Sequence, residues 1–193
     1  MNTVKMQLAH DQHIDQRLQA TQDKLVATLE QYFVTQQNFN TIRVSNLCRD
    51  ANVARQTFYR HYGSIGEIIE VSCVRMINQF LQRIDRTPNS GRISVQLVVD
   101  ALVDHRMLLQ MMFWSDEEEM IIKLITGDLL RVSGFQDISQ IHKPFIAEMM
   151  ARSIVSFARV MLKNQNVDKA GLIHIYTRMV PAPTVIFSDM VFK

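Results

Sequence analysis

Three side chains in the N-terminal half, Arg55, Gln56 and Arg60, carry planar heads with several hydrogen-bonding groups. Arginine heads of this kind bind guanine, and glutamine heads bind adenine, along the base edges of the major groove of DNA. The surrounding charge is positive, because residues 41–62 contain four arginines and a single aspartate. These residue types indicate readout of DNA bases. Exposed arginine and glutamine are also common on ordinary solvated helix faces, so that alternative stays open at this step.

A short helix over about residues 55–61 would present these heads to solvent. Phe58 and Tyr62 lie four positions apart, so they share one face of such a helix. Together with Val53 they are expected to pack inward, which leaves the polar residues exposed or at the rim. Asn52 comes just before this helix, where the chain must turn, and asparagine tolerates left-handed backbone better than most residues other than glycine.

A second short helix is predicted immediately before that turn. Its apolar residues are Val44, Leu47, Cys48 and Ala51, and Asn40-Thr41 offers cap residues for its start. Two short helices joined by a turn of three or four residues make a helix-turn-helix.

Longer amphipathic helices are predicted on both sides of this arrangement. The apolar stripe of the preceding helix consists of Leu18, Leu25, Leu29 and Phe33. A fourth helix is expected to start at Ser64, whose hydroxyl would accept from the backbone N–H of Glu67 while the Glu67 carboxylate reaches back to Ser64. The stretch Thr87-Pro-Asn-Ser-Gly91 is expected to stop that helix. Beyond it, apolar-periodic stretches at about 93–112, 116–133, 144–164 and 168–180 predict further helices, with Ser115-x-x-Glu118 as a second capping box.

Residues 51–62, followed by Gly63-Ser-Ile-Gly-Glu67, resemble the DNA-binding signature of the TetR family of transcriptional regulators. The matching residues, in order and at unbroken spacing, are Val53, Arg55, Thr57, Phe58, Tyr59, His61, Tyr62, Ser64 and Glu67. The resemblance covers about residues 15–86. The rest of the chain is similar to the family only in length and helical character.

The expected fold is all-α, because only 6 glycines and 4 prolines interrupt long stretches of helix formers. A polar, unpatterned segment at 1–14 predicts a flexible arm. The resemblance then implies a three-helix DNA-binding domain at 15–63. It also implies a helical effector-binding and dimerisation domain at 64–193, whose first helix, 64–86, links the two.

The resemblance also implies which side chains bind DNA phosphates. Thr57, Tyr59 and His61 are similar to the family's phosphate-clamping set, which would fix register rather than sequence. Arg43 and Ser45, on the outer face of the second short helix, are further phosphate candidates. A packed core aromatic with a bonded hydroxyl is the alternative interpretation of Tyr59.

Three positions depart from the family pattern. Ile65 stands where the family usually has a phosphate-binding lysine, so we expect the DNA affinity to depend less on salt than in a typical relative. Ala54 replaces the usual serine cap. The missing cap hydrogen bond lowers the stability of the short helix that follows by about 1 kcal/mol. Asn52 replaces the usual turn glycine. These departures keep open a second interpretation, an adaptor that has the regulator fold but acts by binding another protein.

The C-terminal half is expected to form a homodimer. Residues 144–162 carry apolar side chains on nearly all sides, more than one surface of a monomer can bury. By resemblance, the last two long helices would pair with their copies in a four-helix bundle. The predicted interface residues are Ile154, Val155, Phe157, Met161, Ile173 and Met179.

An effector pocket is also implied for the C-terminal half. Methionine and aromatic side chains gather near the middle of the chain, and thioethers adapt to irregular ligand shapes. The candidate contacts are His105, Arg106, Met111, Phe113 and Trp114. Ordinary core packing is the alternative interpretation of the same cluster.

Other classes of protein find little support in the sequence. It has no glycine-rich phosphate loop, no G-x-S-x-G elbow, no H-E-x-x-H motif and no carboxylate pair in a context that would shift its pKa, so neither catalysis nor a cofactor is expected. Cys48 and Cys73 lack zinc spacing and are expected to be buried free thiols. No apolar run approaches the ~20 residues that span a bilayer, which predicts a cytoplasmic protein. The sequence therefore predicts a homodimeric, ligand-responsive repressor that binds a palindromic double-stranded DNA operator.

Overall fold

The computed structural model of the chain describes residues 16–86, 94–132 and 141–180, and over these ranges the fold is all-α with no strand. The predicted fold class is confirmed. The elements in order are α1 (Gln16–Val34), the short 3₁₀ helix η1 (Phe39–Thr41), α2 (Val44–Asp50), α3 (Arg55–His61), α4 (Gly66–Arg86), α5 (Val95–Asp104), α6 (Arg106–Trp114), α7 (Glu118–Val132), α8 (His142–Lys163) and α9 (Lys169–Met179).

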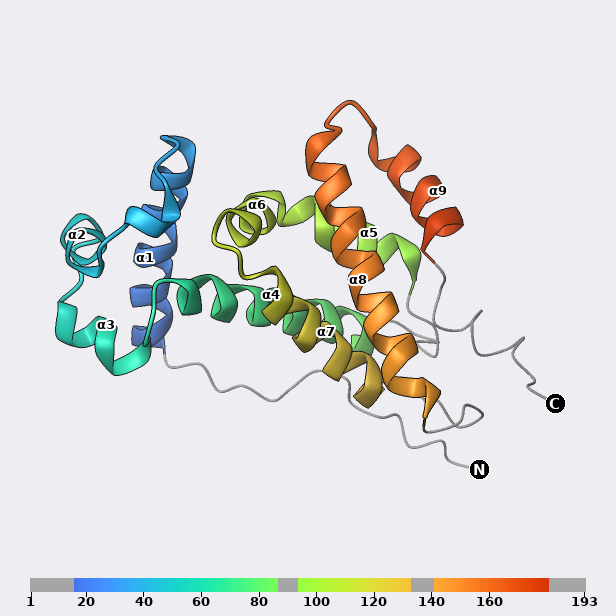
Figure 1. The fold of residues 1–193 in the computed structure, drawn as a ribbon, viewed down its shortest axis with the longest axis horizontal. Coiled ribbons are helices and arrows are strands. Elements are labelled where there is room, and N and C mark those ends of the chain that lie inside the picture. The colour runs from blue at the N-terminus through green and yellow to red at the C-terminus, as the bar shows by residue number, and fades with distance from the viewer. Residues whose placement is uncertain (1–15, 87–93, 133–140, 181–193) are drawn as a thin grey trace.

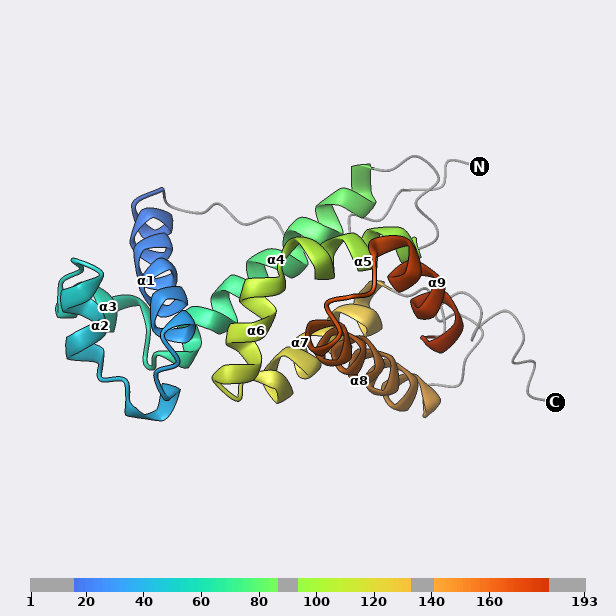
Figure 2. The ribbon, with the colours of Figure 1, turned by 90° about the horizontal axis from the view of Figure 1, so that it is seen from above.

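The helices form an elongated molecule with α1, α2 and α3 at one end (Figure 1). The long helix α4 runs from that end toward the C-terminal helices, and α6 packs against both α1 and α4. At the other end α7 packs along α8, and α9 packs against α5. The view from above shows α1 crossing the start of α4 and α6 lying between α1 and the C-terminal helices (Figure 2). Helix α4 therefore connects the two ends of the molecule, since it contacts α1 at one end and α5 and α7 at the other.

The first three helices enclose a small apolar core. Leu25 and Leu29 of α1, Leu47 of α2 and Phe58 of α3 are completely buried. Since α2 and α3 are only seven residues each, too short to be stable alone in water, their stability comes from this shared core. The helix-turn-helix predicted from the apolar spacing is present over these residues.

The start of α4 differs slightly from the predicted capping box. The backbone N–H of Glu67 donates to the Ser64 hydroxyl at 3.2 Å, as expected. The Glu67 carboxylate, however, accepts from the backbone N–H of Gly63 at 2.7 Å instead of that of Ser64. The reciprocal arrangement is thus one residue wider than predicted, and α4 begins at Gly66.

Two other predicted caps are wrong. Asn40 and Thr41 belong to η1, and the residue that caps α2 is Arg43, without a side-chain hydrogen bond. The Ser115 hydroxyl donates back to the carbonyl of Met112 at 3.1 Å, and the hydrogen bonds of the described residues include none from the first turn of α7 to this hydroxyl. The Thr41 hydroxyl likewise donates to a preceding carbonyl, that of Asn38, at 2.8 Å.

The predicted helical stretch 93–112 is in fact two helices. His105 separates α5 from α6 with non-helical dihedrals, φ −113° and ψ 30°. Its ring Nδ1 lies 2.9 Å from the carbonyl oxygen of Ala101, in the last turn of α5. The predicted flexible arm at 1–14 and the predicted stop at 87–91 lie outside the described residues. None of the helices described is both long enough and apolar enough to cross a membrane.

Candidate nucleic-acid interface

Helix α3 is fixed by two aromatic rings that point into the N-terminal core. Phe58 is 0% exposed and Tyr62 is also buried, with their ring centroids 5.7 Å apart. The backbone N–H of Tyr62 donates to the carbonyl of Phe58 at 2.8 Å and closes the helix. Asn52 in the turn has φ 52°, the left-handed conformation expected from its position. The predicted anchoring of the short helix is confirmed.

The opposite face of α3 presents the three predicted base-reading heads to solvent. Arg55, Gln56 and Arg60 are all exposed. Among the residues described, no carboxylate forms an ion pair with either arginine. Within the described part of the chain, the two guanidinium groups therefore have no internal counter-charge and are free to bind an external partner.

The phosphate candidates lie around this face. Arg43, Ser45 and His61 are exposed, and Thr57 is half-buried. Tyr59 is 55% exposed, although its ring contacts Phe58 edge-on at 5.2 Å. The alternative of a fully packed core aromatic is wrong for Tyr59, because more than half of its side chain faces solvent.

The single aspartate of the segment is held by neighbouring side chains. Asp50 accepts a 2.8 Å hydrogen bond from Nε of Arg49 and a second one from the Tyr32 hydroxyl. These hydrogen bonds, that from Arg49 first, lower the pKa of Asp50, so its carboxylate stays ionised. Burial, followed by the hydrogen bond to Asp50, raises the pKa of Tyr32 to about 12. Since Arg49 neutralises Asp50, the three remaining arginines of the segment give this end of the molecule its positive charge.

Two departures from the family pattern are visible at the ends of the short helices. Ala54 is the N-cap of α3 and makes no side-chain cap hydrogen bond. Ile65 is half-buried and packs against the core, so an apolar contact occupies this position. The interface consequently has one cap and one cationic group fewer than the resemblance implies.

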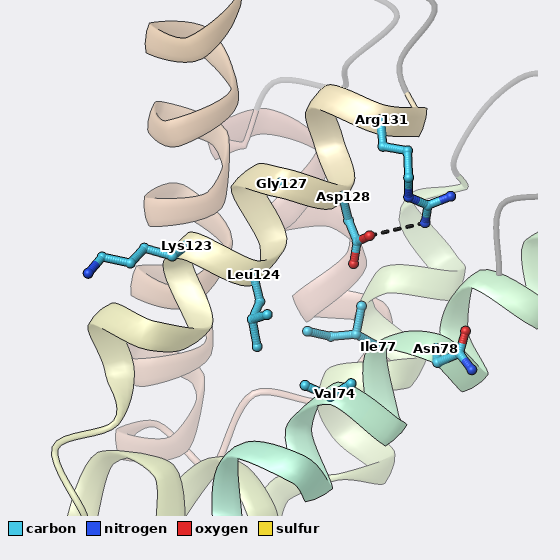
Figure 3. A pocket seen from close by; sticks show the side chains of 8 residues that line it. All are labelled: Val74, Ile77, Asn78, Lys123, Leu124, Gly127, Asp128 and Arg131. Carbon is cyan, nitrogen blue, oxygen red and sulfur yellow. Dashed lines mark hydrogen bonds and ion pairs between the residues drawn. The ribbon is translucent and has the colours of Figure 1, made fainter. Parts of the chain in front are cut away.

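A hollow lies elsewhere, between α4 and α7, and has a volume of about 330 Å³. Its lining residues are Val74, Ile77, Asn78, Lys123, Leu124, Gly127, Asp128 and Arg131. Figure 3 shows Val74, Ile77 and Leu124 facing one another across it, while an Arg131–Asp128 ion pair of 3.0 Å lies at one side. The hollow is thus apolar at its centre with paired charges at its edge.

None of the five predicted effector contacts lines this hollow. Met111 is completely buried in the core, and the Phe113 ring lies beneath the Arg159 guanidinium, 4.2 Å from its centroid. His105 and Arg106 are half-buried at the junction of α5 and α6. Sequence reasoning missed the lining residues because they come from two helices whose packing the sequence does not specify.

Trp114, the fifth of those candidates, has a structural contact instead. Its indole N–H donates to the backbone carbonyl of Gln37 at 2.9 Å, at the C-terminal end of α1. Its ring also packs edge-on against Phe33 and Phe39, with centroids 5.6 and 5.0 Å away. Trp114 therefore joins α6 to the N-terminal helices.

The predicted dimer residues divide into three groups. Val155 and Met161 are buried inside the protomer, so the prediction is wrong for these two, because their faces of α8 are already covered by the chain itself. Ile154, Phe157 and Ile173 are half-buried. Met179 is 72% exposed, and α8 also leaves the apolar side chains of Phe145, Met149 and Val160 exposed.

A pair of carboxyl groups was also missed. Glu117, which precedes α7, lies close enough to Glu70 of α4 to raise the pKa of the Glu70 carboxyl group, in addition to the larger effect of burial. The expectation that no carboxylate pair has a context that shifts its pKa is wrong for these two residues. No spacing rule could have found the two residues, since they lie far apart in the sequence and meet only when α7 packs on α4.

Comparisons with known proteins identify a similar solved structure. No model of a known protein family matches the sequence, and no curated protein matches it. The crystal structure of Lin0861 from Listeria innocua superposes on this chain with a TM-score of 0.81 and 28% sequence identity. The match covers 90% of this chain and 96% of that one, and the name of that protein states no activity or ligand. The all-α architecture is therefore shared over nearly the whole of both chains.

Proposed function

We propose that this protein is a homodimeric DNA-binding transcriptional regulator, acting as a ligand-responsive repressor on a palindromic operator. The observation that carries the proposal is the outward face of α3. Arg55, Gln56 and Arg60 are exposed there, while Phe58 and Tyr62 hold the helix from inside. A short helix with exposed multidentate heads and a fixed backbone fits the major groove of DNA.

Exposed apolar side chains on the last two helices support a homodimer. Phe145 on α8 is 69% exposed and Met179 on α9 is 72% exposed, with Met149 and Val160 also uncovered on α8. A two-fold axis along this surface would bury the same residues of both copies. Two copies of α3 would then have to lie about 34 Å apart to enter successive major grooves.

The hollow between α4 and α7 supports regulation by a small molecule. Val74 and Ile77 of the hollow lie on the same helix whose first turn follows α3. A ligand that binds there and favours one position of α4 would change the separation of the two reading helices, and thereby select the DNA-competent or the DNA-incompetent state. Its largely apolar centre favours a small apolar ligand.

Duplex binding by single-arginine variants tests the proposal. A high-affinity duplex is first selected from a random pool with the wild-type protein, and its dissociation constant is measured by fluorescence anisotropy at two salt concentrations. A lost base contact costs about 1–3 kcal/mol, so we expect Arg55→Ala and Arg60→Ala to weaken binding by roughly 5- to 150-fold. Arg86→Ala is the matched control, because Arg86 is exposed at the far end of α4.

Binding that is absent, or equally strong at both salt concentrations and in both variants, would contradict the DNA-binding proposal. That result would favour the adaptor, for which the missing cap at Ala54 and the apolar Ile65 are the supporting observations. Loss of affinity in Arg86→Ala to the same extent would point to nonspecific charge attraction and would also contradict readout by α3.

A further inference from the structure

The turn between α6 and α7, residues 114–117, contacts the DNA-binding end at two separate points. The first is Trp114, whose indole N–H donates to the carbonyl of Gln37 at 2.9 Å and whose ring lies against Phe33 and Phe39. All three partners belong to the end of α1 or to the short segment that follows it. This contact holds α6 against the first helix of the N-terminal core.

The second contact is made by Glu117 with the first turns of α4. A Cβ atom at Gly66 would lie only 1.9 Å from Oε1 of Glu117, so the carboxyl group lies directly over the first residue of α4. Glu70 follows Gly66 by four positions, so it lies on the same face of α4 one turn further along, where the Glu117 carboxyl group contributes to raising its pKa. The backbone N–H of Glu117 donates to the carbonyl of Met112 at 3.2 Å, which ties the turn to α6.

A hydrogen bond between two carboxyl groups requires a proton. When Glu70 is protonated, its O–H donates to the Glu117 carboxylate, and when the proton leaves for water, two negative charges face each other. Burial, and then the hydrogen bond to Glu117, raises the pKa of Glu70 to about 7. The same pair, after burial, raises the pKa of the neighbouring Cys73 thiol.

The charged groups around the pair do not relieve this repulsion. On α4, Glu67 adds a third negative charge that acts on Glu70. On the other packed elements, Asp23 of α1 is paired with Arg75, and Glu118 and Glu119 of α7 are paired with Arg159 and Arg152. Lys123 of α7 acts on Glu119, and Arg106 lies at the opposite end of α6. Within the described residues, the two side chains whose charges act on Glu70 are Glu117 and Glu67, and both are acidic.

We propose that Trp114 and Glu117 form a proton-dependent clamp, in which a proton shared by Glu70 and Glu117 holds the turn between α6 and α7 against the DNA-binding end. Below neutral pH the clamp is closed. Above it the two carboxylates repel, Glu117 leaves Gly66, and the contact of Trp114 with α1 loosens. The clamp itself stands on the contacts of this chain, whereas its effect on DNA rests on the proposed function.

The direction of the pH dependence follows from the raised pKa of Glu70. A carboxyl group whose pKa is higher in the folded than in the unfolded state contributes stability that is fully present below its unfolded pKa. That contribution is lost as the pH rises through the folded value of about 7. The clamp should therefore open between roughly pH 6 and 8.

The emission of Trp114 reports the clamp directly, because it is the single tryptophan of the chain. Emission spectra of the full chain without DNA are recorded from about pH 5 to pH 9, a range in which a group with a pKa near 7 titrates completely. We expect the wild type to show one shift to longer wavelength with its midpoint close to 7. Increasing accessibility of Trp114 to a neutral quencher should follow the same curve.

Three variants and a control identify the groups responsible. Glu70→Gln and Glu117→Gln keep the shape of the side chain but remove the need for a proton, so the shift should disappear in both. Gly66→Ala displaces the Glu117 carboxyl group without changing any titratable residue, and should give the open spectrum already at low pH. Asp116→Asn is the matched control, since Asp116 is exposed at φ 59°, a conformation that asparagine also adopts, and it should keep the wild-type curve.

A wild-type spectrum that does not change with pH would overturn the clamp, as would a transition that persists unchanged in both glutamine variants. The affinity for the selected duplex, measured at both ends of the pH range, tests the link to DNA. We expect the wild-type affinity to change at least about fivefold more than that of Glu117→Gln. An equal change in the two proteins would overturn that link. A protein that binds no duplex at any pH would contradict the proposed function, while the emission result would still decide on the clamp.

Discussion

Phe58 and Tyr59 are neighbours on α3 with opposite environments, and a pair of substitutions should separate them. Phe58 is fully buried and Tyr59 is more than half exposed. We expect Phe58→Ala to lower the free energy of unfolding by about 3–5 kcal/mol. Tyr59→Ala should cost only about 1 kcal/mol, the value of one edge-on aromatic contact. Urea unfolding followed by circular dichroism measures both.

DNA binding should show the reverse order for the same two residues. Under conditions where both variants are folded, Tyr59→Ala should weaken duplex binding because its exposed hydroxyl is a phosphate candidate. If Tyr59→Ala destabilised the fold as much as Phe58→Ala, the assignment of inward and outward faces on α3 would be wrong.

At the scale of residues, local spacing predicted the anchors and did not predict the distant partners. The four-residue interval between Phe58 and Tyr62 was sufficient to place both rings inside, because it depends only on helix geometry. The left-handed turn at Asn52 was likewise a local property. Trp114 and Glu117, in contrast, find their partners on helices that are remote in sequence. Their roles depend on how α6 and α7 pack against the N-terminal helices.

At the scale of elements, the missing cap of α3 gives a second prediction. Ala54 occupies the N-cap position with extended dihedrals, φ −66° and ψ 135°, and offers no acceptor to the first turn. A serine at this position could accept from a free backbone N–H without a change in the backbone. We expect Ala54→Ser to raise the free energy of unfolding by about 0.5–2 kcal/mol.

Ala54→Gly is the comparison that isolates the hydroxyl, since glycine is tolerated at caps but supplies no side-chain acceptor. Chemical denaturation of the three proteins under identical conditions measures the difference. If serine gave no more stability than alanine, the first turn of α3 would already be satisfied by other groups, and the account of this departure from the family pattern would be wrong.

Helices were easier to predict from the sequence than their ends. The bounds of α3 agree with the predicted 55–61, because an apolar pair and a turn residue define it on both sides. The stretch 93–112 was predicted as continuous, since its apolar periodicity carries on through His105, where the chain breaks. Polar residues near helix starts were also ambiguous: Ser64 caps α4, whereas Ser115 bonds to the carbonyl of the preceding turn. One serine could serve either helix end, and only the backbone path decides which.

At the scale of the whole molecule, α4 connects the N-terminal helices with the C-terminal ones. Its first turn carries Gly66 and Glu70 of the clamp, and its middle carries Val74 and Ile77 of the hollow. The sequence predicted the length and apolar face of this helix, but not that it would contribute to both sites. A ligand in the hollow and a proton at the clamp would act on the same rigid element, so their effects should be coupled.

The last prediction concerns association of two chains through α8 and α9. Phe145 is 69% exposed in the single chain, and burial of such a side chain is worth about 1.5–3 kcal/mol. In a two-fold dimer the residue occurs twice, so Phe145→Ser should weaken association by about 100-fold or more. Light scattering coupled to size-exclusion chromatography over a range of protein concentrations measures the change. Val71→Ser is the control, because Val71 is an apolar side chain that is 42% exposed on α4, away from α8 and α9, and it should leave association unchanged. A wild-type chain that remained monomeric at all concentrations would mean that this apolar surface binds a different partner, and that two copies of α3 are not held together by it.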